Sequence, residues 1–287
     1  MQDIEILKPG LFTTIQDHGR KSVAYYAIPS GGAMDTDAYE KSNLIVNNPI
    51  DYPVVECTIM PPEILFHQER HIALTGADMK WMINGILIQR YKTIYVNKGD
   101  ILSGKPSRDG ARAYIAIAGL IDTQNHYGSY SSYTYASLGG NSGNRLSKGD
   151  FLAIKRGTSQ RTMIEMSIPE SYLQLKSISF ERGPEWNLVS DEGKKKMQSQ
   201  TFKLSAVSNR MGARLLDNKI EANQYNQMSS VPVFPGIIQL PPSGEPIILL
   251  QDGQTTGGYP RIGIINKEEL NRFNQLLPNT SIYLTLN

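Results

Sequence analysis

The sequence predicts a mainly β protein, built as barrels or sandwiches rather than as a doubly wound α/β fold. Short apolar runs separated by Gly- and Pro-rich turns dominate the chain, and few segments show helical periodicity. The chain has 287 residues, of which 40% are hydrophobic and 20% are charged. It is therefore long enough to bury the core of one large domain or, more in keeping with its length, of two ordinary ones.

The clearest strand signal is a hairpin at 81–88. Asn84-Gly85 stands there between two apolar runs, and a type I′ turn needs positive φ at both central residues. The segments 95–102 and 146–154 share the order apolar, polar, Lys-Gly-Asp, apolar, which predicts a strand, a turn and a second strand in each. Further short strands are expected at 113–119, 236–240, 246–250 and 281–286.

Two segments have the pattern of helices. The first, within 33–49, has Asp35 as a candidate N-cap and stops before Pro49. The second, 267–279, places four apolar side chains on one face and begins with acidic residues. A polar stretch at 155–171 lacks periodicity and predicts a boundary at about residue 165, which gives domains 1–165 and 166–287.

Composition argues against several classes of function. The net charge is +2 and no basic stripe is present, so nucleic acid is a poor candidate partner, and Lys194 to Lys196 fit a solvated helix face. The single cysteine, Cys57, lies in a predicted buried strand, and the four histidines lack metal-ligand spacing, so we expect no metal site. No segment resembles a signal peptide or reaches membrane-spanning length, which predicts a cytoplasmic chain with no membrane partner.

Three short motifs in the first half could bind a ligand. Gly31-Gly32 precede a predicted helix start, where free N–H groups could meet an anion, although a tight loop feeding a capped helix is the simpler interpretation. Asp78 ends a predicted strand, where a plain turn is the alternative. Gln16, Asp17 and Arg20 gather in "TTIQDHGR", for which the alternative is a hairpin with Asp17 capping its turn.

Two motifs in the second half are comparable. "SNRMGARL" sets Arg210 and Arg214 around Met211-Gly212; their donor forks suit carboxylate or phosphate, whereas surface ion pairing is the commoner use. "QDGQTTGGYPRIG", residues 251–263, carries far more glycine and hydrogen-bonding capacity than a surface turn needs, and the alternative to a binding loop is a structural hairpin.

Taken in order, the motifs "PGLFTTIQDHGR", "GGAMD", "TGAD", "SNRMGARL" and "FPGIIQLPPSGEPIILLQDGQTTGGYP" resemble one family. This is the C-subunit family of bacterial ATP-dependent 5-oxoprolinase, also described as allophanate hydrolase subunit 2 or as the KipA-like, biotin-dependent carboxyltransferase family. The resemblance runs from about residue 6 to the C-terminus. The chain departs from the family pattern at Leu120, where a glycine is expected, and at Tyr130, where Arg or Cys is more usual.

The resemblance implies two cyclophilin-like β-barrel subdomains with a few short helices. It implies two partners, which are the A and B subunits of 5-oxoprolinase, the latter similar to allophanate hydrolase subunit 1, and it implies ATP and Mg²⁺ as cofactors. The implied reaction opens the 5-oxoproline lactam to L-glutamate, with phosphorylation of the stable amide supplying a leaving group. The lysine flanked by methionines that carries biotin is missing from the chain, so we expect no covalent biotin on it.

The resemblance also suggests roles for residues. Asp252, Tyr259 and Asp17 are the candidate catalytic residues: Asp252 would orient an arginine or accept the lactam N–H, and Tyr259 would wall the pocket or donate its phenol. Substrate or nucleotide would be bound by main-chain amides, hydroxyls and guanidinium groups of the remaining candidates, which are Gln16, Arg20, Gly31, Gly32, Asp78, Arg210, Arg214, Thr255, Thr256, Gly257 and Gly258.

Other functions fit the same sequence. One is the carboxyltransferase component of a biotin-dependent urea or amide carboxylase, which would need a separate biotin carrier. Another is a KipA-like binding protein that regulates a sensor kinase together with a partner similar to the 5-oxoprolinase B subunit. A peptidyl-prolyl isomerase is a weaker candidate, because a cyclophilin-like barrel does not by itself give that activity.

Overall fold

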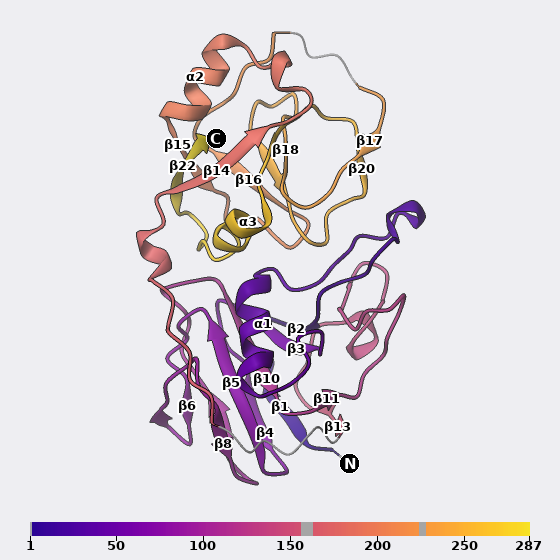
Figure 1. Ribbon diagram of the computed structural model, residues 1–287, viewed down its shortest axis with the longest axis vertical. Helices are drawn as coiled ribbons and strands as arrows, with labels where there is room; N and C mark the ends of the chain where they lie inside the picture. The colour runs from indigo at the N-terminus through magenta and orange to yellow at the C-terminus, as the bar shows by residue number, and fades with distance from the viewer. Residues whose placement is uncertain (1, 156–162, 224–227) are drawn as a thin grey trace. The chain divides into compact units, whose positions relative to one another are not determined.

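The computed structural model describes residues 2–155, 163–223 and 228–287 and is mainly β, as predicted (Figure 1). The chain divides into two compact units, the first formed by Met1–Lys21 with Gly31–Ser171 and the second by Ser22–Ser30 with Tyr172–Asn287. The division therefore falls between Ser171 and Tyr172, and a short segment of the N-terminal half belongs to the second unit. Part of the predicted linker, residues 156–162, lies outside the described residues.

The first unit contains two antiparallel sheets. One has six strands in the order β12 (Phe151–Leu152), β1 (Ile4–Lys8), β4 (Glu63–Phe66), β9 (Ile101–Ser103), β6 (Met82–Ile83) and β7 (Ile86–Leu87). The other has five, in the order β2 (Phe12–Gln16), β3 (Val54–Thr58), β10 (Arg112–Ile117), β5 (Arg70–Gly76) and β8 (Ile94–Val96). A small ribbon pairs β11 (Leu120–Ile121) with β13 (Ile154–Lys155).

One apolar core joins the two sheets of the first unit. Ile6 and Phe66 of the six-stranded sheet pack in the same cluster as Leu74 and Ile115 of the five-stranded sheet. The opposite face of the five-stranded sheet is covered by α1 (Thr36–Ile45), which packs on β5 and β10 (Figure 1). The predicted cap is confirmed, since the Asp35 side chain accepts a hydrogen bond from the amide of Ala38 at 3.1 Å.

The second unit is a closed seven-stranded barrel. Around it run β14 (Ser177–Arg182), β21 (Arg261–Ile264), β18 (Ile237–Gln239), β19 (Ile247–Leu249), β16 (Gly212–Leu216), β15 (Thr201–Leu204) and β22 (Ser281–Leu286). β17 (Val231–Pro232) pairs with β20 (Thr256–Gly257), and α2 (Asp191–Ser199) and α3 (Lys267–Phe273) complete the unit. The alternation in β22 buries Ile282 and Leu284, whose neighbours along the strand are exposed or half-buried, as a barrel wall requires.

Several local predictions can be compared with the structure. Asn84 and Gly85 have φ of 50° and 82°, so the hairpin turn between β6 and β7 is confirmed. The turn after β8 leads into β9 of the other sheet, so it carries the chain between sheets. Within 146–154 the turn and a strand after it are confirmed, but the strand expected before the turn is absent from the described residues. Leu146 is buried in the core instead, and its amide donates to the Thr13 carbonyl.

Candidate functional site

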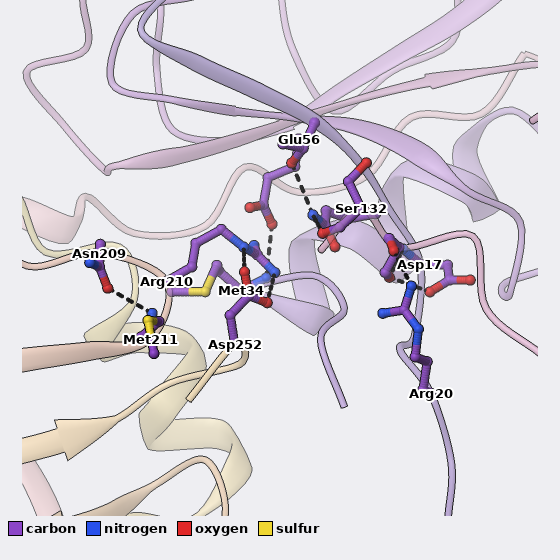
Figure 2. Close-up of polar contacts among 12 residues, drawn as sticks. Asp17, Arg20, Met34, Glu56, Ser132, Asn209, Arg210, Met211 and Asp252 are labelled. Carbon is purple, nitrogen blue, oxygen red and sulfur yellow. Dashed lines mark hydrogen bonds and ion pairs between the residues drawn. The ribbon is translucent and has the colours of Figure 1, made fainter. Parts of the chain in front are cut away.

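Asp17 directly follows β2 and is buried (Figure 2). Its carboxylate binds the loop that contains Ser129 and Ser131. Its Oδ1 accepts hydrogen bonds from both serine hydroxyls, at 2.6 Å from Ser129, and from the Gly19 amide at 2.8 Å. Its Oδ2 accepts from the Tyr130 amide at 2.6 Å. A general base needs a lone pair directed at the substrate, and both oxygens are occupied here. The structure therefore favours a positioning role for Asp17.

Gln16 and Arg20 flank Asp17 and bind the same loop. The Gln16 Nε2 donates to the hydroxyl of Thr14 at 2.9 Å and to the carbonyl of Ser132 at 3.2 Å. The Arg20 guanidinium donates to the carbonyl of Ser131. Three of the predicted residues are thus brought together, and each of them holds backbone or hydroxyl groups of residues 129–132.

Gly31 and Gly32 lead into α1, and the carboxylate of Glu56 binds the backbone between these glycines and the helix. Both glycines have positive φ, 64° and 95°. The Met34 amide donates to Oε2 of Glu56 at 2.8 Å, and that oxygen also accepts from the Tyr114 hydroxyl at 2.9 Å. Glu56 is 1% exposed. The Met34 amide, which comes just before the Asp35 cap of α1, is therefore already bound by a buried carboxylate.

Asp78 lies beyond the end of β5 and interacts with Lys80. Its carboxylate accepts from the Lys80 amide at 3.0 Å and from the Lys80 ammonium at 2.6 Å. Burial alone would raise the pKa of Asp78, but these hydrogen bonds and the charge of Lys80 outweigh it, so the pKa lies below its usual value. This geometry is that of a turn closed by a local ion pair.

In the second unit, Arg210 and Asp252 form a buried bidentate ion pair (Figure 2). Arg210 Nε lies 2.8 Å from Asp252 Oδ2 and its Nη2 lies 2.9 Å from Oδ1. The two side chains are 6% and 5% exposed. The Asp252 amide also donates to the Arg210 carbonyl at 2.9 Å, so backbone and side chains join the same two segments.

A second bidentate pair, which sequence reasoning missed, closes the other end of the same loop. Arg261 donates to Glu185 through Nε at 2.9 Å and through Nη2 at 2.8 Å, and its backbone amide donates to Glu185 at 2.9 Å. These hydrogen bonds hold the pKa of Glu185 below its usual value, although burial acts in the opposite direction. The loop 251–263 is therefore held by one ion pair at Asp252 and by another at Arg261.

Between these two ion pairs, a glycine of the loop 251–263 leaves space for a neighbouring side chain. Gly257 and Gly258 do not have positive φ. A Cβ built on Gly257 would lie 2.6 Å from Nε2 of Gln239, so a larger residue would displace that amide. The Thr255 carbonyl accepts a hydrogen bond from the Val233 amide, and Thr256 pairs with Pro232 of β17. The hydroxyl of neither threonine bonds another described residue.

A pocket of about 290 Å³ opens beside this loop within the second unit. Tyr259 and Arg214 line it together with Ser208, Gln239 and Leu249. The Tyr259 side chain is exposed, whereas Gln239 is 1% exposed. Arg214 Nη1 donates to Glu245 at 3.1 Å. The structure thus brings two of the predicted residues to one pocket, which is also lined by polar residues that were not predicted: Ser208, Asn209, Gln239 and Gln254.

The described part of the chain gives two further results on chemistry. No group of three or more His, Cys, Asp or Glu within it is placed to hold a metal ion, and no helix within it is long and apolar enough to cross a membrane. Cys57 is fully buried in β3, and burial raises the pKa of its thiol well above the usual value. It is a structural thiol, as its sequence context indicates.

The described residues form a unit of two sheets and a unit with a closed barrel, and a pocket lies beside the loop 251–263 in the barrel unit. The chain belongs to the family described as carboxyltransferase domain, subdomain A and B, whose model matches residues 26–286.

The relatives include proteins of two names. The chain is 32% identical to the C subunit of 5-oxoprolinase from Escherichia coli (strain K12), over 95% of this chain and 87% of that protein. It is 30% identical to urea amidolyase of Saccharomyces cerevisiae, over 97% of this chain but 16% of that protein. The crystal structure of the K. lactis urea amidolyase matches with a TM-score of 0.90 and 26% identity, over 99% of this chain and 19% of that one.

Sequence reasoning missed Glu185, Arg261, Gln239 and Ser208. Glu185 is separated from Arg261 by 76 positions, so no local pattern reveals the pair. Gln239 had a visible signal, since it is a lone amide within the apolar run "GIIQL" and therefore a polar group that the barrel must bury. Ser208 is the first residue of the motif "SNRMGARL", but nothing in the sequence indicates that its hydroxyl is buried.

Proposed function

We propose that this chain is one component of an ATP-dependent 5-oxoprolinase, which opens the 5-oxoproline lactam to L-glutamate together with the A and B subunits of that enzyme. The observation that carries this proposal is the relation to the 5-oxoprolinase C subunit, which extends over 95% of this chain and 87% of the Escherichia coli protein. A second protein of that name, from Haemophilus influenzae, is 29% identical over 97% of this chain.

The geometry assigns different roles to the candidate residues. Both oxygens of Asp17 and both oxygens of Asp252 accept hydrogen bonds from groups of the protein itself, so we propose that these carboxylates position loops rather than abstract a proton. Tyr259 and Arg214 line a pocket and are the candidates for contact with a small molecule. Rigid support of the loop that carries Tyr259 is what a binding site requires.

Two of the groups that could bind phosphate already have partners within the protein. The Met34 amide donates to Glu56, and the Arg210 guanidinium donates to Asp252. We therefore assign ATP and its Mg²⁺ to the assembled enzyme rather than to this chain alone.

A second candidate is the carboxyltransferase component of a biotin-dependent urea or amide carboxylase. It is favoured by the match to urea amidolyase of Saccharomyces cerevisiae and by the K. lactis structure. This chain spans less than a fifth of either protein, so it would need a separate biotin carrier and a separate ATP-dependent carboxylase.

The test is to co-express this chain with the A and B subunits of 5-oxoprolinase and to measure glutamate formed from 5-oxoproline and ATP. We expect glutamate only when all three chains and ATP are present. Urea with bicarbonate and a biotinylated carrier is the parallel reaction, and an avidin blot of the host extract identifies such a carrier. Turnover of urea without turnover of 5-oxoproline would transfer the assignment to the second candidate. A change in sensor-kinase autophosphorylation, with neither turnover, would indicate a KipA-like regulator instead.

A further inference from the structure

The pocket beside β16, β18 and the loop 251–263 contains buried polar atoms without protein partners. Within the described part of the chain, Nε2 of Gln239 and Oγ of Ser208 have no hydrogen-bond partner. Both residues line the pocket. A buried polar group without a partner destabilises the folded state, so a folded protein rarely keeps two of them in one pocket without a ligand or ordered water to satisfy them.

The orientation of Gln239 is set by its neighbours. Gln254 Nε2 donates to Gln239 Oε1 at 3.3 Å, which leaves the Nε2 of Gln239 as the group without a partner. Gly257 keeps this position open, because any Cβ there would lie 2.6 Å from the same nitrogen. The loop is held in place by its two ion pairs, so this space is part of a rigid arrangement.

The polar groups that line this pocket are rich in donors. Gln239 offers an amide N–H₂, Ser208 a hydroxyl and Tyr259 a phenol. Arg214 adds a positive charge; among the described residues it bonds Glu245 through Nη1 alone, which leaves Nε and Nη2 available. Because several hydrogen-bond donors and a guanidinium group line the same pocket, a suitable ligand carries a negatively charged hydrogen-bond acceptor.

The volume of the pocket and its apolar lining residues restrict the class of ligand that it can bind. Leu249, 2% exposed, and the half-buried Ile247 and Met211 line the same pocket, so the ligand has an apolar part as well as a charged end. A volume of about 290 Å³ lies at the lower limit of small-molecule sites, which are usually about 300–1,000 Å³. Inorganic anions lack the apolar part, and nucleotides exceed the space.

We propose that this pocket binds a small carboxylic acid, whose carboxylate accepts hydrogen bonds from Gln239 and Ser208 and faces Arg214, while its carbon skeleton packs on Leu249. 5-Oxoproline and L-glutamate belong to this class, and to that extent the inference rests on the proposed function and deepens it. Binding is measured on this chain alone and turnover on the assembled complex, so the failure of one is distinguishable from the failure of the other.

The experiment is a titration of the full chain followed by side-chain amide NMR and by calorimetry. The probes are 5-oxoproline, L-glutamate, 2-pyrrolidinone, which is the same lactam without the carboxylate, and inorganic phosphate. We expect a carboxylate probe to bind with a Kd in the millimolar range or tighter and to shift the Gln239 amide signals. No binding by either carboxylate, equal binding by 2-pyrrolidinone, or equal binding by phosphate would overturn the proposal.

Variants test the named atoms. Gln239→Glu keeps the side-chain size but replaces the N–H₂ by a second negative oxygen, so the affinity should fall at least about tenfold. Gly257→Ala, which displaces the Gln239 amide without changing any charge, and Ser208→Ala should weaken binding in the same direction. Gln198→Glu on the exposed face of α2 is the matched control and should bind as the wild type does.

The variants also guard against misfolding. Ser208→Ala adds no buried charge and keeps the test valid if Gln239→Glu fails to fold. Unchanged affinity in both Ser208→Ala and Gly257→Ala, with the folded state verified by the same NMR spectra, would show that the ligand lies elsewhere and would overturn the assignment.

Discussion

The ion pair between Arg210 and Asp252 gives the sharpest prediction of this structure. Asp252→Ala removes the carboxylate that accepts two hydrogen bonds of 2.8 and 2.9 Å and leaves the guanidinium buried, with the Arg210 side chain 6% exposed. Removing one partner of a buried ion pair costs about 3–5 kcal/mol, because the remaining charge is not resolvated. We expect a loss of that size in the stability of the second unit.

The two tryptophans of the chain allow each unit to be followed separately. Trp81 lies in the first unit and Trp186 in the second. In a Trp81→Phe background, the fluorescence of Trp186 reports guanidinium unfolding of the second unit. Lys194→Ala is the control in that unit, since it removes an exposed pair with Asp191, which is 94% exposed, and should cost less than about 1 kcal/mol.

The double variant Arg210→Met with Asp252→Leu separates stability from chemistry. Replacing both members of a buried pair by apolar residues is often neutral, so the double variant should recover most of the stability that Asp252→Ala loses. An Asp252→Ala cost below about 1 kcal/mol would refute the burial argument. Recovered stability together with recovered glutamate formation would confirm a positioning role, whereas recovered stability without turnover would show that Asp252 or Arg210 acts in the chemistry.

Two further predictions concern titration and reactivity. Glu185 has a folded pKa below its unfolded value of about 4.3, chiefly through the hydrogen bonds from Arg261, so its contribution to stability is present above that value and is lost as the pH falls through the folded pKa. Arg261→Met should therefore flatten the loss of second-unit stability between about pH 5 and pH 3, as followed by Trp186 fluorescence, and an unchanged slope would contradict the assignment. Burial raises the pKa of the Cys57 thiol, so the native chain should not react with a disulfide reagent at about pH 8 and should take up one equivalent on unfolding; rapid reaction of the native chain would show that β3 is not buried.

Local patterns predicted the elements well, for identifiable reasons. The Asn84-Gly85 turn and the Asp35 cap depend on residues within four positions of one another, and the structure confirms both. The end of α3 was harder to predict from the sequence, because the apolar periodicity continues beyond it. The helix ends at Phe273, and Leu276 lies in a tight turn in which its amide donates to the Phe273 carbonyl. Periodicity alone does not distinguish a helix from a turn that buries the same side chains.

Only part of the candidate site could be predicted from the sequence. Motifs identified Asp17, Arg210 and Asp252, but not whether their charges are open to a ligand or bound inside the protein. That depends on partners such as Ser131, which is 114 positions away from Asp17, and on the fold that brings them together. The number of glycines in the loop 251–263 predicts backbone freedom, whereas in the structure Gly257 provides space for the Gln239 amide.

The most direct test of the proposed function is the stoichiometry of the reaction that this chain performs together with the A and B subunits of 5-oxoprolinase. ADP and L-glutamate are measured in the same reaction with 5-oxoproline, with and without this chain. We predict that one glutamate forms for each ADP and that both products disappear when this chain is omitted. Equal glutamate formation without this chain, or ADP release with no glutamate in its presence, would contradict the proposal.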